Sequence, residues 1–219
     1  MACYVRLMCK EDIPQVVEID REAFPTLWPQ PNYRRELDNR LAHYIVACDE
    51  AERIEEAEVK ATPQEGFSGL VSRLRQLFNH DHSSDNELTS SGKQYIFGFA
   101  GLWVMAGEAH ITNIAVRERH HRQGIGELLL ISLIDLATEL DASLVTLEVR
   151  ASNITAQSLY SKYGFTWVGV RRGYYTDNRE DAVLMSVENI TSAPVQANLQ
   201  RLKQAHSQTW SLLTKSRKC

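Results

Sequence analysis

Two glycines spaced one residue apart, Gly124 and Gly126, separate an apolar stretch from a long helical pattern, and Arg122 lies beside them. From Ile125 onward the apolar residues recur every three to four positions, which is the period of a helix. Glycine in the first turn of a helix costs about 1 kcal/mol relative to alanine, so its use here indicates that bare backbone is needed. The unpaired N–H groups at a helix N-terminus, at the positive end of the helix dipole, bind phosphate groups. These residues therefore predict a site for a pyrophosphate.

The residues around the glycines exclude two common phosphate-binding loops. The third glycine of the dinucleotide-binding GxGxxG pattern is missing, and the Gly-Lys-Ser/Thr of a P-loop does not follow. The alternative to a phosphate site is an ordinary strand-to-helix turn in which glycine only allows close packing. The glycines alone do not separate these two interpretations.

The elements next to the glycines must position this site. Residues 111–116 are expected to form a strand before a helix at 125–140, and residues 144–149 a strand after it. Short joins between these elements give a right-handed crossover and two parallel neighbouring strands. The tight turn Ala106-Gly107-Glu108 makes residues 94–105 the antiparallel partner of 111–116. Because ligands bind beyond the carboxyl ends of parallel strands, the glycines lie where a ligand is expected.

The rest of the chain completes an α/β (α+β) fold with a mixed sheet of about seven strands flanked by helices. We interpret residues 171–178 as a loop. Further strands are expected at 3–8, 43–48, 165–170 and 182–188, and helices at 12–22, at 32–41, at 154–163 and from 194 onward.

Two polar segments stand apart from this pattern. Residues 49–93 begin with a strongly acidic run and continue into a serine-rich, linker-like stretch, so we interpret them as an insertion within a domain spanning 1–188. A short amphipathic helix at 67–78 could lie inside it. Residues 189–219 form a basic C-terminal helical extension, with five Lys or Arg and no Asp or Glu. This helix could cover the sheet, pair with the acidic insertion or remain solvated, and we favour solvation.

Composition limits the class of protein. The chain has 219 residues, 43% of them apolar and 24% charged, which suits one globular domain. A net charge of −4 argues against a protein that grips nucleic acid. Without a signal-peptide pattern or a long apolar run, we expect a cytoplasmic protein that does not enter a membrane, as a monomer or weak dimer. The four cysteines lack CxxC spacing, and we read His80-Asp81-His82 as solvated loop, so we predict no metal site.

The segment His121-Arg122-Gln123-Gly124-Ile125-Gly126 resembles the acyl-CoA pyrophosphate loop of the GNAT N-acetyltransferases, Gln/Arg-x-x-Gly-x-Gly/Ala, with His121 as the one departure. A longer stretch, from Asn113 to Met185, is similar to the RimI-type enzymes of that family, the ribosomal-protein-alanine N-acetyltransferases. The likeness is carried by LEVRASN at 147–153, Leu159-Tyr160, YGF at 163–165 and RRGYY at 171–175. It implies the GNAT fold, acetyl-CoA as cosubstrate and a protein N-terminus as the acceptor, with the N-terminal alanine of a small-subunit ribosomal protein as the expected substrate.

The resemblance also assigns roles to individual residues. It implies that Glu148 is the general base and Tyr160 the general acid, and that Trp28, Tyr174 and Tyr175 line the peptide-accepting lip. The coenzyme is assigned to Ile114, Ala115 and Val116, whose backbone would pair with the pantetheine arm, to Arg122, Gln123, Gly124, Ile125, Gly126 and Glu127 for the pyrophosphate, and to Asn153 for a hydrogen bond to the pantetheine.

Physical chemistry is consistent with these roles. Transfer of an acetyl group to an amine needs a neutral amine and a proton donor for the departing thiolate. An α-amino group, with a pKa of about 7.7 to 8.0, is far more often neutral near pH 7.5 than a lysine, with a pKa of about 10.4. Alternatives for the two side chains are a solvated edge charge for Glu148 and a core aromatic for Tyr160. Two rival functions stay open: acetylation of lysine or a small amine, and an acetyl-CoA-binding module without catalysis.

Overall fold

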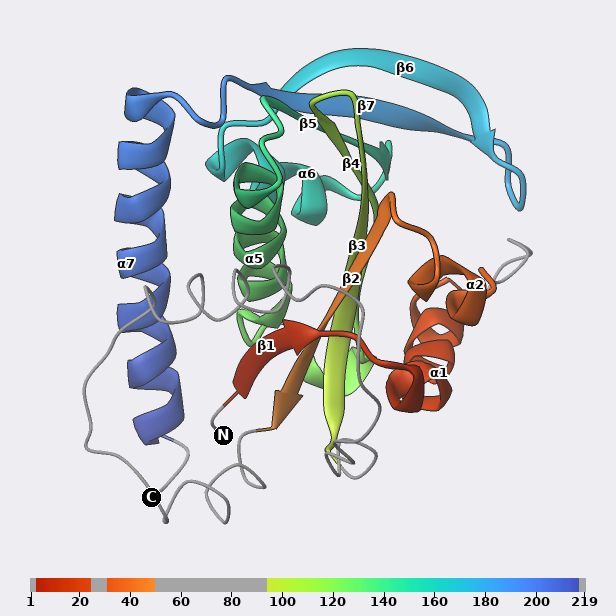
Figure 1. Cartoon of the computed structure of the whole chain (residues 1–219), viewed down its shortest axis with the longest axis vertical. Coiled ribbons are helices and arrows are strands. Elements are labelled where there is room, and N and C mark those ends of the chain that lie inside the picture. Colours follow the sequence, from red (N-terminus) through yellow and green to blue (C-terminus); the bar gives the residue numbers. More distant parts are fainter. Residues whose placement is uncertain (1–2, 25–30, 50–93, 217–219) are drawn as a thin grey trace.

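The computed structural model describes residues 3–24, 31–49 and 94–216, with side chains up to residue 210 (Figure 1). Its strands form one mixed sheet in the order β1-β2-β3-β4-β5-β7-β6, in which only the β4–β5 pair is parallel. The predicted mixed sheet of about seven strands is therefore confirmed. The strands are β1 (Cys3–Leu7), β2 (Ala42–Asp49), β3 (Ile96–Met105), β4 (Glu108–Val116), β5 (Leu144–Arg150), β6 (Thr166–Tyr175) and β7 (Glu180–Glu188).

Helices cover both faces of this sheet (Figure 1). On one face α1 (Ile13–Ala23) and α2 (Tyr33–Leu37) pack on a small core around Phe99. On the other face α5 (Ile125–Glu139), α6 (Ile154–Lys162) and α7 (Ala193–Ser216) enclose the main core. Two short 3-10 turns, η1 (Lys10–Asp12) and η3 (Glu118–His120), complete the described elements. None of the described helices is both long enough and apolar enough to cross a membrane.

Helix α7 packs against α5, so the expectation of a solvated C-terminal helix is wrong. Leu199 and Leu202 of α7 are buried in the main core, and Lys203 forms an ion pair with Asp135 of α5. Figure 1 shows the two helices side by side. The sheet lies on the other side of α5, which explains why this helix is buried around most of its circumference. The acidic insertion and residues 67–78 lie outside the described residues.

The expected loop at 171–178 is also wrong, because β6 continues through Tyr175. Its partner is β7, and the pairing runs from Thr166↔Ser186 to Tyr175↔Glu180 with a register shift between Arg171 and Tyr175. At that shift Gly173 adopts a φ of +57°. Pairing with a long neighbouring strand supplies hydrogen bonds that local composition does not reveal. The irregular stretch, a β-bulge, lies within the strand rather than beyond its end.

Two irregularities shape the centre of the sheet. The β3–β4 register shifts between Gly101 and Leu102, which pair with Asn113 and Ile111. The parallel β4–β5 ladder then ends at Ile111↔Leu147, although β4 continues to Val116 and β5 to Arg150. These two strand ends pair with β3 and β7 but not with each other, and we call the region between them the β4–β5 opening.

Candidate active site

The β4–β5 opening provides a backbone edge for a ligand. Each strand alternates its side chains across the sheet, and backbone groups at an unpaired edge remain available for hydrogen bonds. Ile114, Ala115 and Val116 of β4 lie at this edge, with Ala115 buried and the other two partly buried. These are the residues for which the sequence predicts pairing with a pantetheine arm. Their position at an unpaired strand edge suits that role.

The glycine turn follows directly after β4. Gly124 is the N-cap of α5 and adopts the left-handed conformation, with φ +84°. Its carbonyl accepts the first helical hydrogen bond from Leu128 N at 2.9 Å. A Cβ built on Gly126 would lie 3.8 Å from Val116 Cγ2, so the helix begins close to the end of β4. The N–H groups of the first turn therefore open toward the same end of the sheet as the β4–β5 opening, which fits a diphosphate.

The side chains of this turn fold back onto the chain. His121 Nε2 lies 2.8 Å from the carbonyl oxygen of Val116, and since a carbonyl only accepts, this nitrogen donates. Gln123 Nε2 donates to the carbonyl of Arg119 at 3.2 Å. Arg122 adopts a positive φ of 60°. The backbone of the turn, rather than the amide of Gln123, is thus the part best placed to meet an anion.

Glu127, which the sequence assigns to the pyrophosphate, directs its carboxylate to α6. One carboxylate oxygen accepts hydrogen bonds from Lys162 Nζ at 2.5 Å and Tyr163 Oη at 2.6 Å. Burial alone would raise the pKa of Glu127, but the hydrogen bonds from Lys162 and Tyr163 lower it overall. The carboxylate therefore joins α5 to α6, and only the backbone N–H of Glu127 suits a phosphate.

Glu148 lies on β5 with a side chain that is 7% exposed, between two basic groups. Its Oε2 is 3.0 Å from His110 Nε2 on β4, and its Oε1 is 3.0 Å from the guanidinium of Arg171 on β6. The hydrogen bond from His110 is the largest cause of a lowered Glu148 pKa, and the charge of Arg171 lowers it further. These effects outweigh burial. Glu148 is therefore an ionised carboxylate near neutral pH and not the solvated edge charge considered above.

A chain of hydrogen bonds continues from His110 along the sheet. Thr146 donates its single hydroxyl proton to Glu108 Oε1 at 2.9 Å. Its oxygen, 2.9 Å from His110 Nδ1, must then accept from that nitrogen. His110 is consequently held with Nε2 toward Glu148. The sequence did not single out His110, because the strand was expected to start at Ile111, three positions after Glu108, whereas β4 begins at Glu108 itself.

Tyr160 approaches from the opposite face of the sheet. Val145, Leu147 and Val149 point into the main core, so Glu148 projects to the other face. Tyr160 of α6 packs against the main core, with its ring centroid 5.9 Å from that of Phe165.

Burial raises the pKa of Tyr160 to about 12. In the described part of the chain its hydroxyl has no hydrogen-bond partner. A phenol in this state keeps its proton near neutral pH.

The two tyrosines predicted for the lip lie at the bulge of β6. Tyr174 and Tyr175 contact each other edge to face at 5.2 Å, and Arg150 stacks on Tyr175 with its guanidinium carbon 4.0 Å from the ring centroid. Burial raises the pKa of Tyr175, and Tyr160 and Glu148 both contribute electrostatically to the shift. Tyr175 therefore lies within electrostatic range of both predicted catalytic side chains. Trp28 lies outside the described residues.

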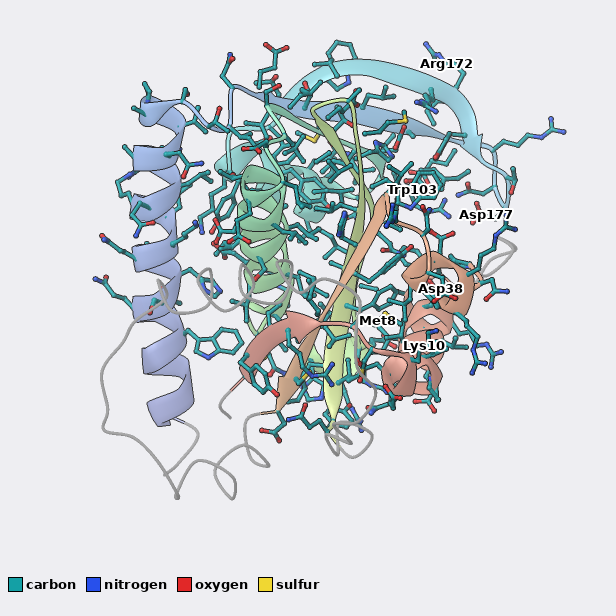
Figure 2. The ribbon with its side chains drawn as sticks, in the orientation of Figure 1. Met8, Lys10, Asp38, Trp103, Arg172 and Asp177 are labelled. Carbon is teal, nitrogen blue, oxygen red and sulfur yellow. The ribbon has the colours of Figure 1, made fainter. Side chains whose placement is uncertain are left out.

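Arg150 and Asn153 fix the corner between β5 and α6. Arg150 forms ion pairs with Asp177 at 2.9 Å and Glu180 at 3.2 Å, both on the β6–β7 hairpin, where Figure 2 labels Asp177 and Arg172. Asn153 caps α6 through Oδ1, which accepts from Ala156 N at 3.1 Å. With Oδ1 used for the cap, the amide nitrogen of Asn153 is the group that could donate to a pantetheine.

Comparisons with known proteins identify the class. A profile of the acetyltransferase (GNAT) family matches residues 58–165. A Bacillus subtilis (strain 168) protein provisionally named a [ribosomal protein bS18]-alanine N-acetyltransferase is 35% identical over 184 residues, which are 84% of this chain and 93% of that protein. The chain belongs to the GNAT family of acetyltransferases. It is an N-acetyltransferase.

Further similar proteins include one curated enzyme and two solved structures. The [ribosomal protein bS18]-alanine N-acetyltransferase of Escherichia coli (strain K12) is 44% identical over 103 residues, covering 46% of this chain and 68% of that protein. The crystal structure of the Escherichia coli ribosomal-protein-S18-alanine N-acetyltransferase matches with a TM-score of 0.59 and 25% identity, over 86% of this chain and 94% of that one. Arabidopsis thaliana NAA60 in complex with acetyl-CoA shares the fold, with a TM-score of 0.61 and 15% identity over 85% of this chain and 98% of that one.

Within the described residues no group of three or more His, Cys, Asp or Glu could hold a metal ion. His80, Asp81 and His82 lie outside them. Cys48 is buried and Cys3 and Cys9 are partly exposed, and within the described residues none of the three forms a disulfide. Cys3 lies on β1, Cys9 follows β1 and Cys48 lies on β2, so all three are away from the β4–β5 opening.

Proposed function

We propose that this N-acetyltransferase transfers the acetyl group of acetyl-CoA to the N-terminal α-amino group of a protein, with the N-terminal alanine of a ribosomal protein as the substrate. Glu148 is the general base and Tyr160 the general acid. The observation that carries this proposal is their placement: an ionised carboxylate on one face of the sheet and a protonated phenol on the other, next to the β4–β5 opening. The names of the Bacillus subtilis and Escherichia coli relatives support the substrate class.

The coenzyme fits two features of the chain. The N–H groups at the start of α5 would bind its diphosphate, and the unpaired edge of Ile114 to Val116 would pair with its pantetheine arm. The amide nitrogen of Asn153 would donate a hydrogen bond to the same arm. This arrangement would bring the thioester to the opening between Glu148 and Tyr160.

The reaction then requires two proton transfers. The amine nitrogen bonds to the acetyl carbon while the carbon–sulfur bond breaks, so the nitrogen must lose a proton and the thiolate must gain one. Glu148, through a water molecule, accepts the proton from the amine, and Tyr160 donates its proton to the sulfur. General acid–base steps of this kind contribute roughly 10²- to 10⁴-fold each to a rate. The acetyl group passes directly to the amine, without a cysteine acyl-enzyme.

A weak base favours an α-amino acceptor. The pKa of Glu148 is lowered, so this carboxylate cannot by itself deprotonate a lysine ammonium effectively. An α-amino group is already about one-third neutral near pH 7.5, against on the order of a thousandth for lysine. Tyr174 and Tyr175, together with the 24–31 segment that contains Trp28, would form the lip that admits the peptide. Lysine or small-molecule amine acetylation is the rival activity, and a non-catalytic acetyl-CoA-binding module is the other.

Thiol release from acetyl-CoA tests these functions with three acceptors: an Ala-starting peptide, the same peptide with a blocked N-terminus and an internal lysine, and a polyamine. We expect turnover only with the free N-terminus. Glu148→Gln and Tyr160→Phe should each lower kcat by roughly 10²- to 10⁴-fold while acetyl-CoA still binds.

Glu188→Gln at the exposed end of β7 and Tyr4→Phe on β1 are matched controls. Preference for the polyamine or lysine would establish the rival activity. Coenzyme binding without turnover on any acceptor would establish the binding module.

A further inference from the structure

The C-terminal helix α7 contacts α5 at two places. It packs against the middle of α5, and it also reaches the glycine turn at the start of α5. Its N-terminal half is anchored by buried Leu199 and Leu202 and by the ion pair of Lys203 with Asp135. One turn further along α7, His206 is 5% exposed, and Trp210 packs against the main core one turn after that. Figure 1 shows α7 running alongside α5 over this length.

His206 is hydrogen bonded to the residue that begins α5. Its Nε2 lies 3.1 Å from the carbonyl oxygen of Gly124, and because a carbonyl only accepts, Nε2 carries the proton and donates. The same carbonyl accepts the first helical hydrogen bond from Leu128 N at 2.9 Å. Gly124 is therefore held by its own helix on one side and by α7 on the other.

The packing around Gly124 leaves little room for a side chain. A Cβ at this position would lie 3.2 Å from His206 Nε2 and 3.2 Å from two ring carbons of Trp210. The rings of His206 and Trp210 contact each other, with centroids 5.6 Å apart. Gly124 also adopts φ +84°, a conformation that side chains rarely allow. Two aromatic rings of α7 thus form a wall behind the glycine turn.

We propose that His206 and Trp210 are positioning residues of the coenzyme site: they fix the Gly124 turn so that the N–H groups of the first turn of α5 are aligned for the diphosphate of acetyl-CoA. This inference rests on the proposed coenzyme site at that turn. Glycine has the largest backbone freedom to lose on ordering. A turn that is ordered in advance by α7 binds its ligand more tightly, because less entropy is lost on binding.

The test separates the diphosphate from the rest of the coenzyme. His206→Phe keeps a ring in the wall but removes the donor to Gly124, and His206→Gln restores a donor of similar reach. Each is assayed with acetyl-CoA and with acetyl-pantetheine, which has the same thioester and lacks the diphosphate. Gln208→Ala, at an exposed position of the same helix, is the control.

We expect His206→Phe to raise the KM for acetyl-CoA about 2- to 12-fold, the effect of one lost hydrogen bond, with kcat and the peptide KM unchanged. Its kcat/KM with acetyl-pantetheine should equal that of the unaltered chain, and His206→Gln should recover most of the loss. An unchanged KM for acetyl-CoA would overturn the proposal. So would an equal loss with both donors, which indicates a general effect on folding.

Trp210→Leu provides a second variant that leaves His206 in place. It should also raise the KM for acetyl-CoA and spare acetyl-pantetheine, and an effect on both donors or on neither would again contradict the inference. If the unaltered chain turned over neither donor, the proposed function itself would fail, and this result differs from every outcome expected of the variants.

Discussion

His110 Nε2 on β4 lies 3.0 Å from Glu148 Oε2 on β5, and this contact orients the predicted base. His110 is fixed in turn by Thr146, whose hydroxyl donates to Glu108. The arrangement connects two neighbouring strands on the face of the sheet opposite the main core. A carboxylate that is hydrogen bonded in this way stays ionised and keeps one orientation.

Replacing His110 by alanine should lower kcat/KM for the peptide about 10- to 100-fold, because a hydrogen bond to a charged group is worth about 1.5–3 kcal/mol. Steady-state rates at pH 7.5 measure the effect. Thr146→Val, which leaves the contact between His110 and Glu148 in place, should cost less. Equal rates for His110→Ala and the unaltered chain would show that the contact has no part in the reaction.

The pH dependence should follow the α-amino group of the substrate and not Glu148 or Tyr160. The pKa of Glu148 is lowered, so Glu148 is ionised throughout the neutral range, and the pKa of Tyr160 is raised to about 12, so the phenol stays protonated. We therefore expect kcat/KM to rise with pH through the α-amino pKa of about 7.7 to 8.0 and then to level off.

Two peptides with different N-terminal pKa values provide the control for this profile. The midpoint of the rise should move with the peptide. A midpoint that stays fixed for both peptides would instead assign the ionisation to an enzyme group.

Substitution at Gly101 should destabilise the fold at the β3–β4 bulge. A Cβ there would lie 2.4 Å from Tyr44 Cε1 and 2.8 Å from Asn113 Oδ1, so one of these must move. Overpacking of this kind costs about 1–3 kcal/mol, which Gly101→Ala should show as a lower midpoint in urea unfolding. At Gly169 a Cβ would meet nothing within 4 Å, so Gly169→Ala should be close to neutral. A similar midpoint for both variants would argue against the clash.

Among the ion pairs near the N-terminus, the pair of Asp12 with Arg6 should be the most sensitive to pH. The Asp12 carboxylate is 1% exposed and accepts two hydrogen bonds from Arg6, at 2.6 and 2.8 Å. Burial would raise the pKa of Asp12, but the bonds from Arg6 and Cys9 lower it. Its stabilisation is therefore present above the unfolded carboxyl pKa of about 3.9 and is lost as the pH falls through the lower folded value.

Asp12→Asn should reduce the free energy of unfolding by about 3 kcal/mol at pH 7, at the low end for a buried pair since Arg6 is partly exposed. Urea unfolding at pH 7 and near pH 3 should show this difference shrinking at the lower pH. The exposed pair of Lys10 and Asp38, 2.9 Å apart and labelled in Figure 2, is the control. Asp38→Asn should change stability by less than about 0.5 kcal/mol at either pH. A constant deficit for Asp12→Asn would refute the linkage.

Local sequence determined much of this protein. The helical period after Gly124 and the turn at Gly107 depend on neighbouring residues, and both appear in the structure as the sequence predicts. The order of strands around the parallel pair followed from the lengths of the joins and the handedness of the crossover. Motifs within one segment also marked Glu148 and Tyr160 as candidates for catalysis.

Tertiary structure alone decided what surrounds those residues. His110 and Arg171 meet Glu148 from different strands, and the bulge that holds Tyr174 exists because β6 pairs with β7 beyond the point where its own composition suggests a loop. The packing of α7 on the glycine turn joins residues 82 positions apart. A one-dimensional pattern records propensity and period, whereas such contacts depend on how separate elements are placed in space, and that is fixed only when the whole core has packed.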